Sequence, residues 1–359
     1  MRSPGPLGAS DRGWRTTARA CLLAAGCLLG GCASTASQDP PRVAPRLGGT
    51  IVQFKPSDNL RTRADWARSF RSLRALGMTQ VVLQWTADGE AAYYPSQRLR
   101  TGPMPPLDTL VDLAEAAGMR VLVGLSHDPM YWSRIAGEPD QVARYLGELR
   151  SRSLRVAREL VPRLAHRRAF EGWYLSEEID DLNWRDPARH AMVSAHLKAL
   201  TSELRTLDAR ARIAISGFAN AGTDRVVLQA FWEDLLTEAP ELGIVMFQDG
   251  VGVGKLSLEE LPGVLAAVKR AVDGRQRELR VIVEVFRQTA GAPIDTRPFA
   301  AEPASIERLR QQIAIGRAFS ADLLAFTVPD YMSPGDTAAK ARLFEQYRRA
   351  CVESDCIVP

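Results

Sequence analysis

From residue 48 onward, the chain alternates between short apolar runs and longer amphipathic stretches. The runs are almost continuously apolar, which is typical of strands buried on both faces of a parallel sheet. The amphipathic stretches predict helices, and several begin with Asp or Ser and end at Gly. The predicted strands are residues 49–54, 80–85, 120–125, 172–176, 212–216, 243–247, 280–285 and 322–327, and the predicted helices are 65–76, 107–117, 141–164, 186–207, 257–272, 305–318 and 337–350.

This alternation predicts an α/β fold of one domain, a (β/α)8 TIM barrel over residues 48–359. Eight strands in roughly 310 residues match the count and the size of that fold. A doubly wound open sheet is the alternative, but no glycine-rich phosphate loop follows the first run. The glycine-rich segment 250–254 follows the sixth run and lacks the Gly-Lys-Ser/Thr signature, so we interpret it as a flexible loop.

The N-terminus has the layout of a secretory signal peptide. Four arginines within residues 2–19 precede an uncharged apolar run over residues 20–29, which is too short to span a membrane. The next segment, LGGC at residues 29–32, resembles the lipobox of bacterial lipoproteins. The resemblance implies that residues 1–31 are removed and that Cys32 carries acyl chains, which would anchor the protein to a membrane. Cys27 is a weaker candidate, and an ordinary signal peptide is the alternative.

The residues after Cys32 predict a tether and a location. Residues 32–47 contain three prolines and are expected to be extended. By resemblance to bacterial sorting signals, Ala33 and Ser34, with no Asp beside the cysteine, favour the outer membrane facing the periplasm. In an oxidising periplasm, Cys351 and Cys356 could form a disulfide, and two free thiols are the alternative.

Charge and composition indicate no nucleic acid, metal or cofactor as a partner. The formal net charge is only +4, and the basic residues are spread along the chain, so no nucleic-acid-binding surface is expected. Polar and aromatic side chains instead gather at the ends of the predicted strands, where a TIM barrel builds its active site. Aromatic rings beside carboxylates and amides suit a polysaccharide or oligosaccharide, because the rings stack on sugar C–H faces while the polar groups bind hydroxyls. The candidate substrate-binding residues are Gln53, Gln84, Trp85, Tyr94, His127, Asp128, Trp132, Tyr174, Asp180, Asn183, Trp184, Asn220, Gln248, Asp249 and Tyr331.

Some of these candidates have a second interpretation. Asp180 and Asn183 are equally suited to cap the helix that follows them. Tyr94 and Trp184 are equally consistent with packing inside loops. His127 could bind a metal, but the other three histidines lie in helical stretches, so a polar contact is favoured.

Two carboxylates carry the prediction of chemistry. Glycoside hydrolysis needs an acid for the leaving oxygen and a nucleophile or base on the other side of the anomeric carbon. The fourth run ends in Glu177 and Glu178, and the seventh contains Glu284. This placement resembles a large clan of retaining glycosidases on this barrel, in which the acid/base ends strand 4 and the nucleophile ends strand 7.

The identity of the acid stays open at this point. The clan usually has Asn before its strand-4 Glu, whereas Ser176 and Glu177 precede Glu178 here. Alternation along a strand favours Glu178, because it shares a face with Tyr174 and Ser176. Glu284 stands in an apolar run, where a carboxylate is costly to bury unless it is paired or lies at a solvent-lined mouth. A structural bridge from Glu284 to an arginine across the barrel is the alternative.

Short sequence strings in the chain resemble a bacterial family of TIM barrels. They are VLQWT at 82–86, AYYPS at 92–96, GWYL at 172–175 and EIDD at 178–181 with Trp184. The family is catalogued as a domain of unknown function, number 4434, and is regarded as glycosyl-hydrolase-like. The resemblance covers about residues 48–335 and implies the fold and a carbohydrate-related role.

The sequence therefore predicts a lipid-anchored glycoside hydrolase that acts on an envelope polysaccharide. In this hypothesis Glu178 is the general acid/base and Glu284 the nucleophile. The alternative from another class is a non-catalytic glycan-binding lipoprotein that assists exopolysaccharide export or envelope assembly. A third hypothesis, a metal-dependent hydrolase, is supported only by His127 and by aspartates that are scattered along the chain.

Overall fold

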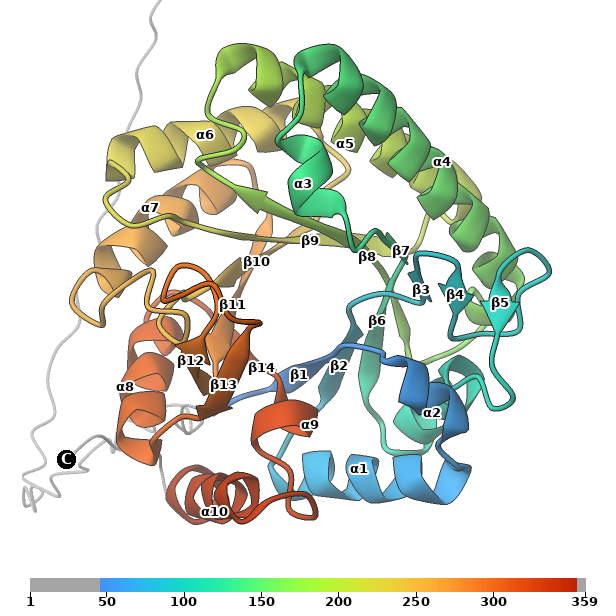
Figure 1. Ribbon diagram of the computed structural model, residues 1–359, viewed down its shortest axis with the longest axis vertical. Helices are drawn as coiled ribbons and strands as arrows, with labels where there is room; N and C mark the ends of the chain where they lie inside the picture. The colour runs from blue at the N-terminus through green and yellow to red at the C-terminus, as the bar shows by residue number, and fades with distance from the viewer. Residues whose placement is uncertain (1–45, 354–359) are drawn as a thin grey trace, which may run out of the picture. The chain divides into compact units, whose positions relative to one another are not determined.

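A closed barrel of eight parallel strands forms the centre of the molecule (Figure 1). The computed structural model describes residues 46–353. The last barrel strand pairs with the first and so closes the sheet. This confirms the predicted (β/α)8 TIM barrel. The barrel strands are β1 (Gly49–Val52), β2 (Gln80–Leu83), β6 (Arg120–Gly124), β8 (Phe170–Asp180), β9 (Arg212–Phe218), β10 (Ile244–Gln248), β11 (Glu278–Glu284) and β14 (Asp322–Phe326).

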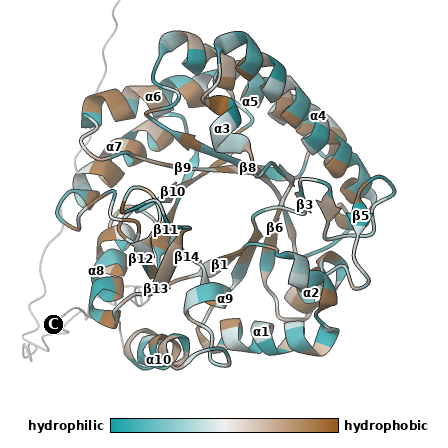
Figure 2. Cartoon of the chain, viewed as in Figure 1, coloured by the Kyte–Doolittle hydropathy of each residue, from teal (hydrophilic) through white to brown (hydrophobic). Residues whose placement is uncertain are grey.

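Helices surround the barrel on its outside. Figure 2 shows that they carry hydrophobic and hydrophilic residues in turn, as expected of helices with one face on the barrel. Side chains cap several of them: Thr62 accepts a hydrogen bond from the Asp65 N–H, and Asp186 accepts from two N–H groups of its helix. The ring consists of α1 (Arg63–Ala75), α2 (Leu107–Ala116), α4 (Pro139–Leu164), α5 (Pro187–Leu207), α6 (Arg225–Glu238), α7 (Leu261–Gly274), α8 (Ile306–Arg317) and α10 (Ala338–Tyr347).

The structure contains one ring helix, α6, that the sequence pattern did not predict. Asp224 caps it by accepting hydrogen bonds from the Val226 and Val227 N–H groups. Val226 is 75% exposed and Val227 is 47% exposed, so apolar residues occur on both faces of its first turn. The apolar stripe that marks an amphipathic helix is therefore blurred.

Two layers of apolar side chains hold the barrel together. A small cluster fills the barrel interior, with Ile51, Val82, Leu122 and Met246 among its members. A much larger cluster lies between the strands and the helices. Burial on both faces explains why the strand sequences are continuously apolar.

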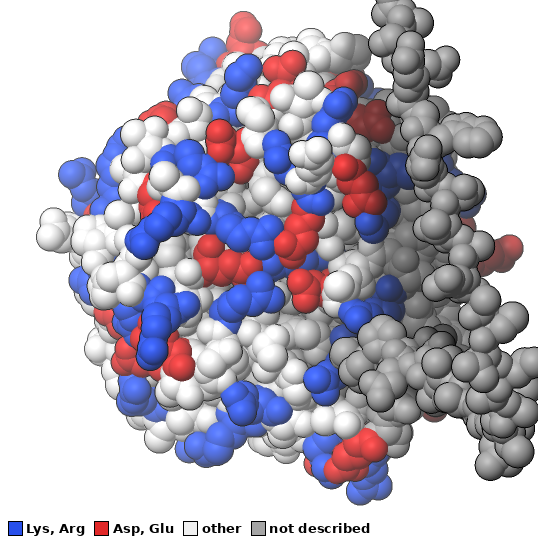
Figure 3. Space-filling view, turned by 180° about the vertical axis from the view of Figure 1, so that it is seen from behind, with Lys and Arg blue, Asp and Glu red and all other residues white. Residues whose placement is uncertain are grey.

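The end of the barrel opposite the strand carboxyl ends is closed by ion pairs. Arg280, at the start of β11, is fully buried, and its guanidinium lies 2.5 Å from both Glu171 and Glu278. Arg212 also pairs with both glutamates, at 3.3 and 2.6 Å. Figure 3, the view from behind, shows acidic and basic side chains mingled on this face.

Short elements follow the carboxyl ends of the strands and build the rim of the barrel. One small sheet contains β3 (Ala87–Asp88), β4 (Ala91–Ala92), β5 (Arg100–Thr101) and β7 (Ser126–His127). A hairpin of β12 (Phe286–Ala290) and β13 (Ala300–Pro303) follows β11. The remaining rim elements are η1 (Pro56–Leu60), α3 (Tyr131–Ile135) and α9 (Val328–Tyr331).

Several sequence predictions fall outside the described residues. The signal peptide, Cys32, most of the tether and Cys356 belong to this group, so they stay predictions, as does the disulfide with Cys351. Leu47 is already buried, and its N–H donates to the Tyr347 hydroxyl at 2.7 Å. Within residues 46–353, no helix combines the length and apolar character needed to cross a membrane.

Candidate active site

A cavity of about 530 Å³ lies at the carboxyl ends of the barrel strands. Residues from the ends of β2, β8, β9, β10 and β11 contribute to its lining, together with residues of the rim. Its polar and aromatic lining includes Gln53, Gln84, Trp85, His127, Trp132, Ser176, Glu178, Phe218, Gln248, Lys255, Glu284, Phe286, Gln288, Phe299 and Tyr331. Of the three glutamates singled out for strands 4 and 7 of the barrel, Glu178 and Glu284 therefore line one cavity.

Glu178 reaches the cavity from an irregular end of β8. The pairing with β9 shifts between Leu175 and Glu178, so β8 has more residues than its neighbour at this point. Glu178 Oε1 accepts hydrogen bonds from Gln248 Nε2 at 3.0 Å and from Gln84 Nε2 at 3.4 Å. Burial raises the pKa of Glu178, and the hydrogen bond from Gln248 opposes the rise. A carboxyl in such a site holds a proton more firmly than one in water.

Glu177 lies on the opposite face of β8. Its Oε1 is 3.0 Å from His196 Nε2 of α5, and both side chains are buried. Glu177 does not line the cavity, so the structure removes it from the catalytic candidates. The physical reason is the alternation of side chains along the strand.

Glu284 is the last residue of β11, and a second buried carboxyl lies next to it. Its Oε2 accepts a hydrogen bond from the Val253 N–H at 2.9 Å. Asp249 lies behind it, with Oδ1 accepting from the Glu284 N–H at 3.2 Å and Oδ2 accepting from Gln312 Nε2 at 2.6 Å. Burial, and then the charge of Asp249, raise the pKa of Glu284 to about 8.

Within residues 46–353, no arginine side chain bridges to the Glu284 carboxyl across the barrel. Arg308 comes close, but its guanidinium donates to the backbone carbonyl oxygens of Glu284 and Phe286. Among the described residues, none forms an ion pair with the Glu284 carboxyl. The side chain is therefore available to a ligand in the cavity.

Lys255 brings a cation into the same cavity. It stands on the loop after β10, and its Nζ lies 3.4 Å from the centroid of the Phe218 ring. Burial lowers the pKa of Lys255, and the nearby Asp180, Glu178 and Glu284 oppose that change. The sequence analysis did not single out Lys255, because a lysine in a glycine-rich loop carries no pattern of its own.

Aromatic rings form the walls of the cavity. Trp85 stacks on His127 with centroids 4.3 Å apart, and the His127 ring is held by Asp88 at 2.8 Å. Trp132 is 43% exposed and lies 5.8 Å from Phe218. Trp132 therefore offers an exposed apolar face on which a sugar ring can stack, and Trp85 and Phe218 are buried beside it in the cavity lining.

A second aromatic wall comes from the β12–β13 hairpin and α9. Phe286 stacks on Tyr331 with centroids 4.9 Å apart and touches Phe299 edge-on. Phe286 and Phe299 were not candidates in the sequence, because a hairpin inserted after a barrel strand follows no helix or strand period. Only the fold brings it over the strand ends.

Eight of the predicted substrate-binding residues do not line the cavity. Tyr94 and Trp184 are fully buried and pack in the core, and Tyr174 lies inside the barrel with its hydroxyl on Ser216. Asp128 is buried beside Arg134 and Arg152. The others are Asp180, to which Asn183 and Asn220 each donate a hydrogen bond, and Asp249, which accepts from the Glu284 N–H.

Asp180 has a structural role in the turn after β8. Its Oδ1 accepts hydrogen bonds from the N–H groups of Leu182 and Asn183, at 2.8 and 2.9 Å. Asn220 donates to Asp180 from the neighbouring β9 loop at 3.1 Å. These bonds join the loop after β8 to the loop after β9, which begins just after Phe218, and Asp180 does not line the cavity.

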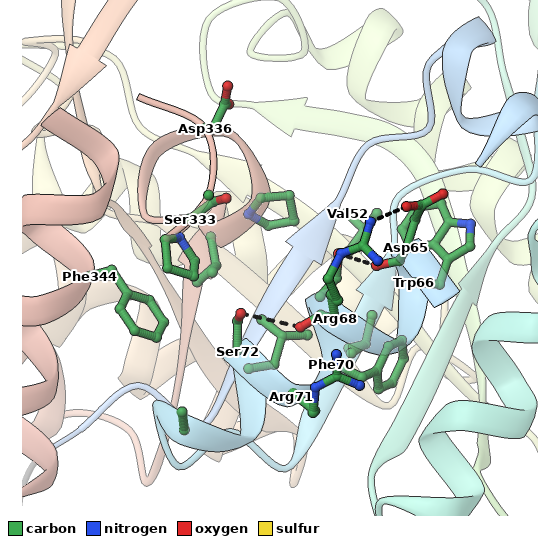
Figure 4. A pocket seen from close by; sticks show the side chains of 18 of the residues that line it. Val52, Asp65, Trp66, Arg68, Phe70, Arg71, Ser72, Ser333, Asp336 and Phe344 are labelled. Carbon is green, nitrogen blue, oxygen red and sulfur yellow. Dashed lines mark hydrogen bonds and ion pairs between the residues drawn. The ribbon is translucent and has the colours of Figure 1, made fainter. Parts of the chain in front are cut away.

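A second cavity, of about 850 Å³, lies between α1 and residues 328–344 (Figure 4). Its two carboxylates are each occupied by a neighbouring cation, Asp65 by Arg68 and Asp336 by Lys340. It therefore lacks a free carboxylate pair, and the barrel mouth remains the candidate site. Within residues 46–353, no group of three His, Cys, Asp or Glu side chains could hold a metal ion.

The closed parallel barrel, with a cavity at the carboxyl ends of its strands, defines the class of the protein as a (β/α)8 TIM barrel. The chain belongs to the family described as Domain of unknown function (DUF4434), whose model matches residues 47–338. This confirms the resemblance drawn from the sequence strings. The uncharacterized protein YbcH of Escherichia coli K12 is 31% identical over 225 residues, which are 62% of this chain and 71% of YbcH.

Solved structures of similar fold agree with this class. A candidate alpha-L-fucosidase from Bacteroides thetaiotaomicron has a TM-score of 0.69 at 18% identity, covering 86% of this chain and 95% of its own. Xylanase10C from Cellvibrio japonicus, solved in complex with xylopentaose, has a TM-score of 0.52 at 11% identity, covering 88% and 69%. At these identities the likeness shows the fold alone.

Proposed function

We propose that this protein hydrolyses glycosidic bonds of a polysaccharide in the bacterial envelope, with retention of configuration. The observation that supports it is the meeting of Glu178 and Glu284 in one cavity walled by aromatic rings. The xylanase of similar fold was solved with xylopentaose, which supports a carbohydrate as the ligand. The envelope location rests on the sequence segment that resembles a lipobox.

In the first step, the Glu178 carboxyl gives its proton to the glycosidic oxygen while the Glu284 carboxylate attacks the anomeric carbon. The bond to the leaving sugar breaks, and a glycosyl ester forms on Glu284. Because Glu178 Oε1 accepts two amide N–H bonds, its proton is carried by Oε2. Burial raises the pKa of Glu178 and so favours the protonated form that this step needs.

In the second step, the Glu178 carboxylate takes a proton from water, and the water attacks the anomeric carbon. The ester bond to Glu284 breaks, and both carboxyls return to their starting states. The Val253 N–H stabilises Glu284 as the departing carboxylate, since hydrogen bonds to an ionised carboxyl favour that form.

The test is the release of new reducing ends from the host's extracellular and cell-wall polysaccharides. Glu284→Gln should release none, and Glu178→Gln should be slower by about 10²- to 10⁴-fold. Glu259→Gln is the matched control, because Glu259 is an exposed carboxylate outside the cavity lining. Full activity in Glu284→Gln would contradict the proposal. Nuclear magnetic resonance of the first product gives its anomeric configuration, and an inverted product would exclude the two-step route.

A non-catalytic glycan-binding protein is the second candidate, and one observation favours it. A Glu284 pKa of about 8 leaves much of this carboxyl protonated at neutral pH, which weakens it as a nucleophile. In this case the wild-type protein would bind glycans but would release no reducing ends at any pH between about 5 and 9. The upper end of this range is about one unit above the Glu284 pKa, so that Glu284 would be mostly ionised there.

A further inference from the structure

We propose that the sugar unit bound in this cavity carries a carboxylate, and that Lys255 binds it. This inference rests on the proposed glycan-binding role of the cavity and adds the chemical class of the glycan. Its starting point is the position of Lys255, whose side chain lies in the cavity lining with Glu178 and Glu284.

Lys255 differs from the other lysines of the chain because it has no ion pair with any residue of 46–353. The sequence has five lysines, and all of them lie within the described residues. The other four each pair with a carboxylate: Lys55 with Asp330, Lys198 with Glu238, Lys269 with Asp273 and Lys340 with Asp336. Among residues 46–353, no carboxylate oxygen lies within ion-pair distance of Lys255, and no hydrogen bond from its ammonium is found.

The Phe218 ring holds the Lys255 ammonium in place without using its hydrogen-bond donors. A cation over an aromatic face is attracted by the ring, and the N–H groups that point away stay free for a ligand. The lowered pKa of Lys255 shows that the surrounding carboxylates do not offset the cost of burying its charge. A bound anion would supply the missing compensation.

The neighbouring wall gives the sugar a place to stack. Trp132 is exposed beside Phe218, so a sugar ring on Trp132 would bring a substituent toward the ammonium. A single ammonium matches the single negative charge of a carboxylate, whereas a phosphate monoester carries up to about two negative charges at neutral pH. No arginine is among the residues that line this cavity.

The experiment uses the Glu284→Gln protein, which blocks turnover, and measures binding by calorimetry. The probes are oligosaccharides of polygalacturonate and alginate, the same oligosaccharides with their carboxyl groups reduced to alcohols, and dextran sulfate. We expect the uronates to bind at least tenfold more tightly than their reduced forms. Adding Lys255→Met should weaken uronate binding about tenfold and leave binding of the reduced forms unchanged, so that the preference for uronates is lost. Adding Lys255→Arg instead should keep the preference.

Lys269→Met in the Glu284→Gln background is the matched control. It removes one lysine charge on α7, from a residue already paired with Asp273, and should leave both affinities unchanged. Equal weakening of charged and reduced probes by Lys255→Met would overturn the inference, as would tighter binding of dextran sulfate or of the neutral forms. Absence of uronate binding by any variant would also overturn it. If the wild-type protein hydrolysed neutral glycans, the proposed function would hold even though the inference about a carboxylate had failed. The failure of this inference can therefore be distinguished from the failure of the proposed function.

Discussion

Glu177 and Glu178 are adjacent in the chain but have opposite environments. Glu178 faces the cavity and two glutamine amides, whereas Glu177 is buried against His196 behind the strand. Removing one partner of a buried pair leaves the other uncompensated. The two residues should therefore fail in different ways when each is changed.

We predict that Glu177→Ala lowers the free energy of unfolding by about 1–3 kcal/mol, because it leaves the buried His196 Nε2 without its hydrogen-bond partner. Denaturant unfolding measures this loss. The folded fraction should keep its kcat for glycan hydrolysis. A variant that is fully stable but inactive would instead place Glu177 in the chemistry.

The pH dependence of the reaction should report Glu284. Only its ionised form can attack, so kcat/KM should rise with pH through an apparent pKa of about 8. Asp249→Asn removes the negative charge behind Glu284 and should move this rise to lower pH. A pH–rate profile of both proteins checks the shift, and identical profiles would argue against the role of Asp249.

The same shift has a consequence for folding. Because the pKa of Glu284 is raised in the folded state, this group binds its proton more tightly there than in the unfolded chain. The free energy of unfolding therefore decreases as the pH rises from 4.5, the ordinary pKa of a glutamate, to about 8, the pKa of Glu284 in the folded protein. Glu284→Gln should flatten this decline in the free energy of unfolding, measured between pH 5 and 8.

At the residue scale, the sequence predicted the carboxylates better than their surroundings. Glu178 and Glu284 could be found because barrel active sites lie at strand ends. Asp249 was expected to contact substrate, and nothing in its local sequence shows that it lies behind Glu284. Lys255 was missed because its importance depends on Phe218, which the β9 end brings to it.

At the element scale, the apolar runs located each barrel strand to within a few residues, because both faces of each strand are buried. The irregular pairing of β8 could not be predicted from the hydrophobic pattern of its own sequence, because a shift in register also depends on the neighbouring strand. Helix α6 was not predicted, because its exposed valines blur the apolar stripe that marks an amphipathic helix. The β12–β13 hairpin was missed because it is an insertion with no barrel counterpart.

The ion pairs at the closed end of the barrel join the starts of β8, β9 and β11. We predict that Arg280→Met lowers the free energy of unfolding by about 3–5 kcal/mol, because it leaves Glu171 buried without its main partner. Thermal unfolding in low salt measures the loss. Since these residues lie at the far end of the strands from Glu284, KM should stay as in the wild type. A raised KM would show that the two ends of the barrel are coupled.

At the scale of the whole molecule, the sequence predicted the fold, and the structure and the family match both agree with it. Attachment to a membrane stays a prediction. Cys32→Ser should abolish labelling of the protein by radioactive palmitate and should release it from the membrane fraction. Cys27→Ser is the control and should leave both unchanged, whereas loss of labelling only in Cys27→Ser would move the lipid to that residue.

The described chain enters the domain at the end of the barrel opposite the cavity. Leu47 is fixed to Tyr347 just before β1 begins at Gly49, whereas Gln53, just past the end of β1, already lines the cavity. Residue 46, where the described chain begins, therefore lies toward the end of the barrel away from Glu178 and Glu284. A tag or linker fused directly before residue 46 would leave the mouth of the cavity open to a glycan.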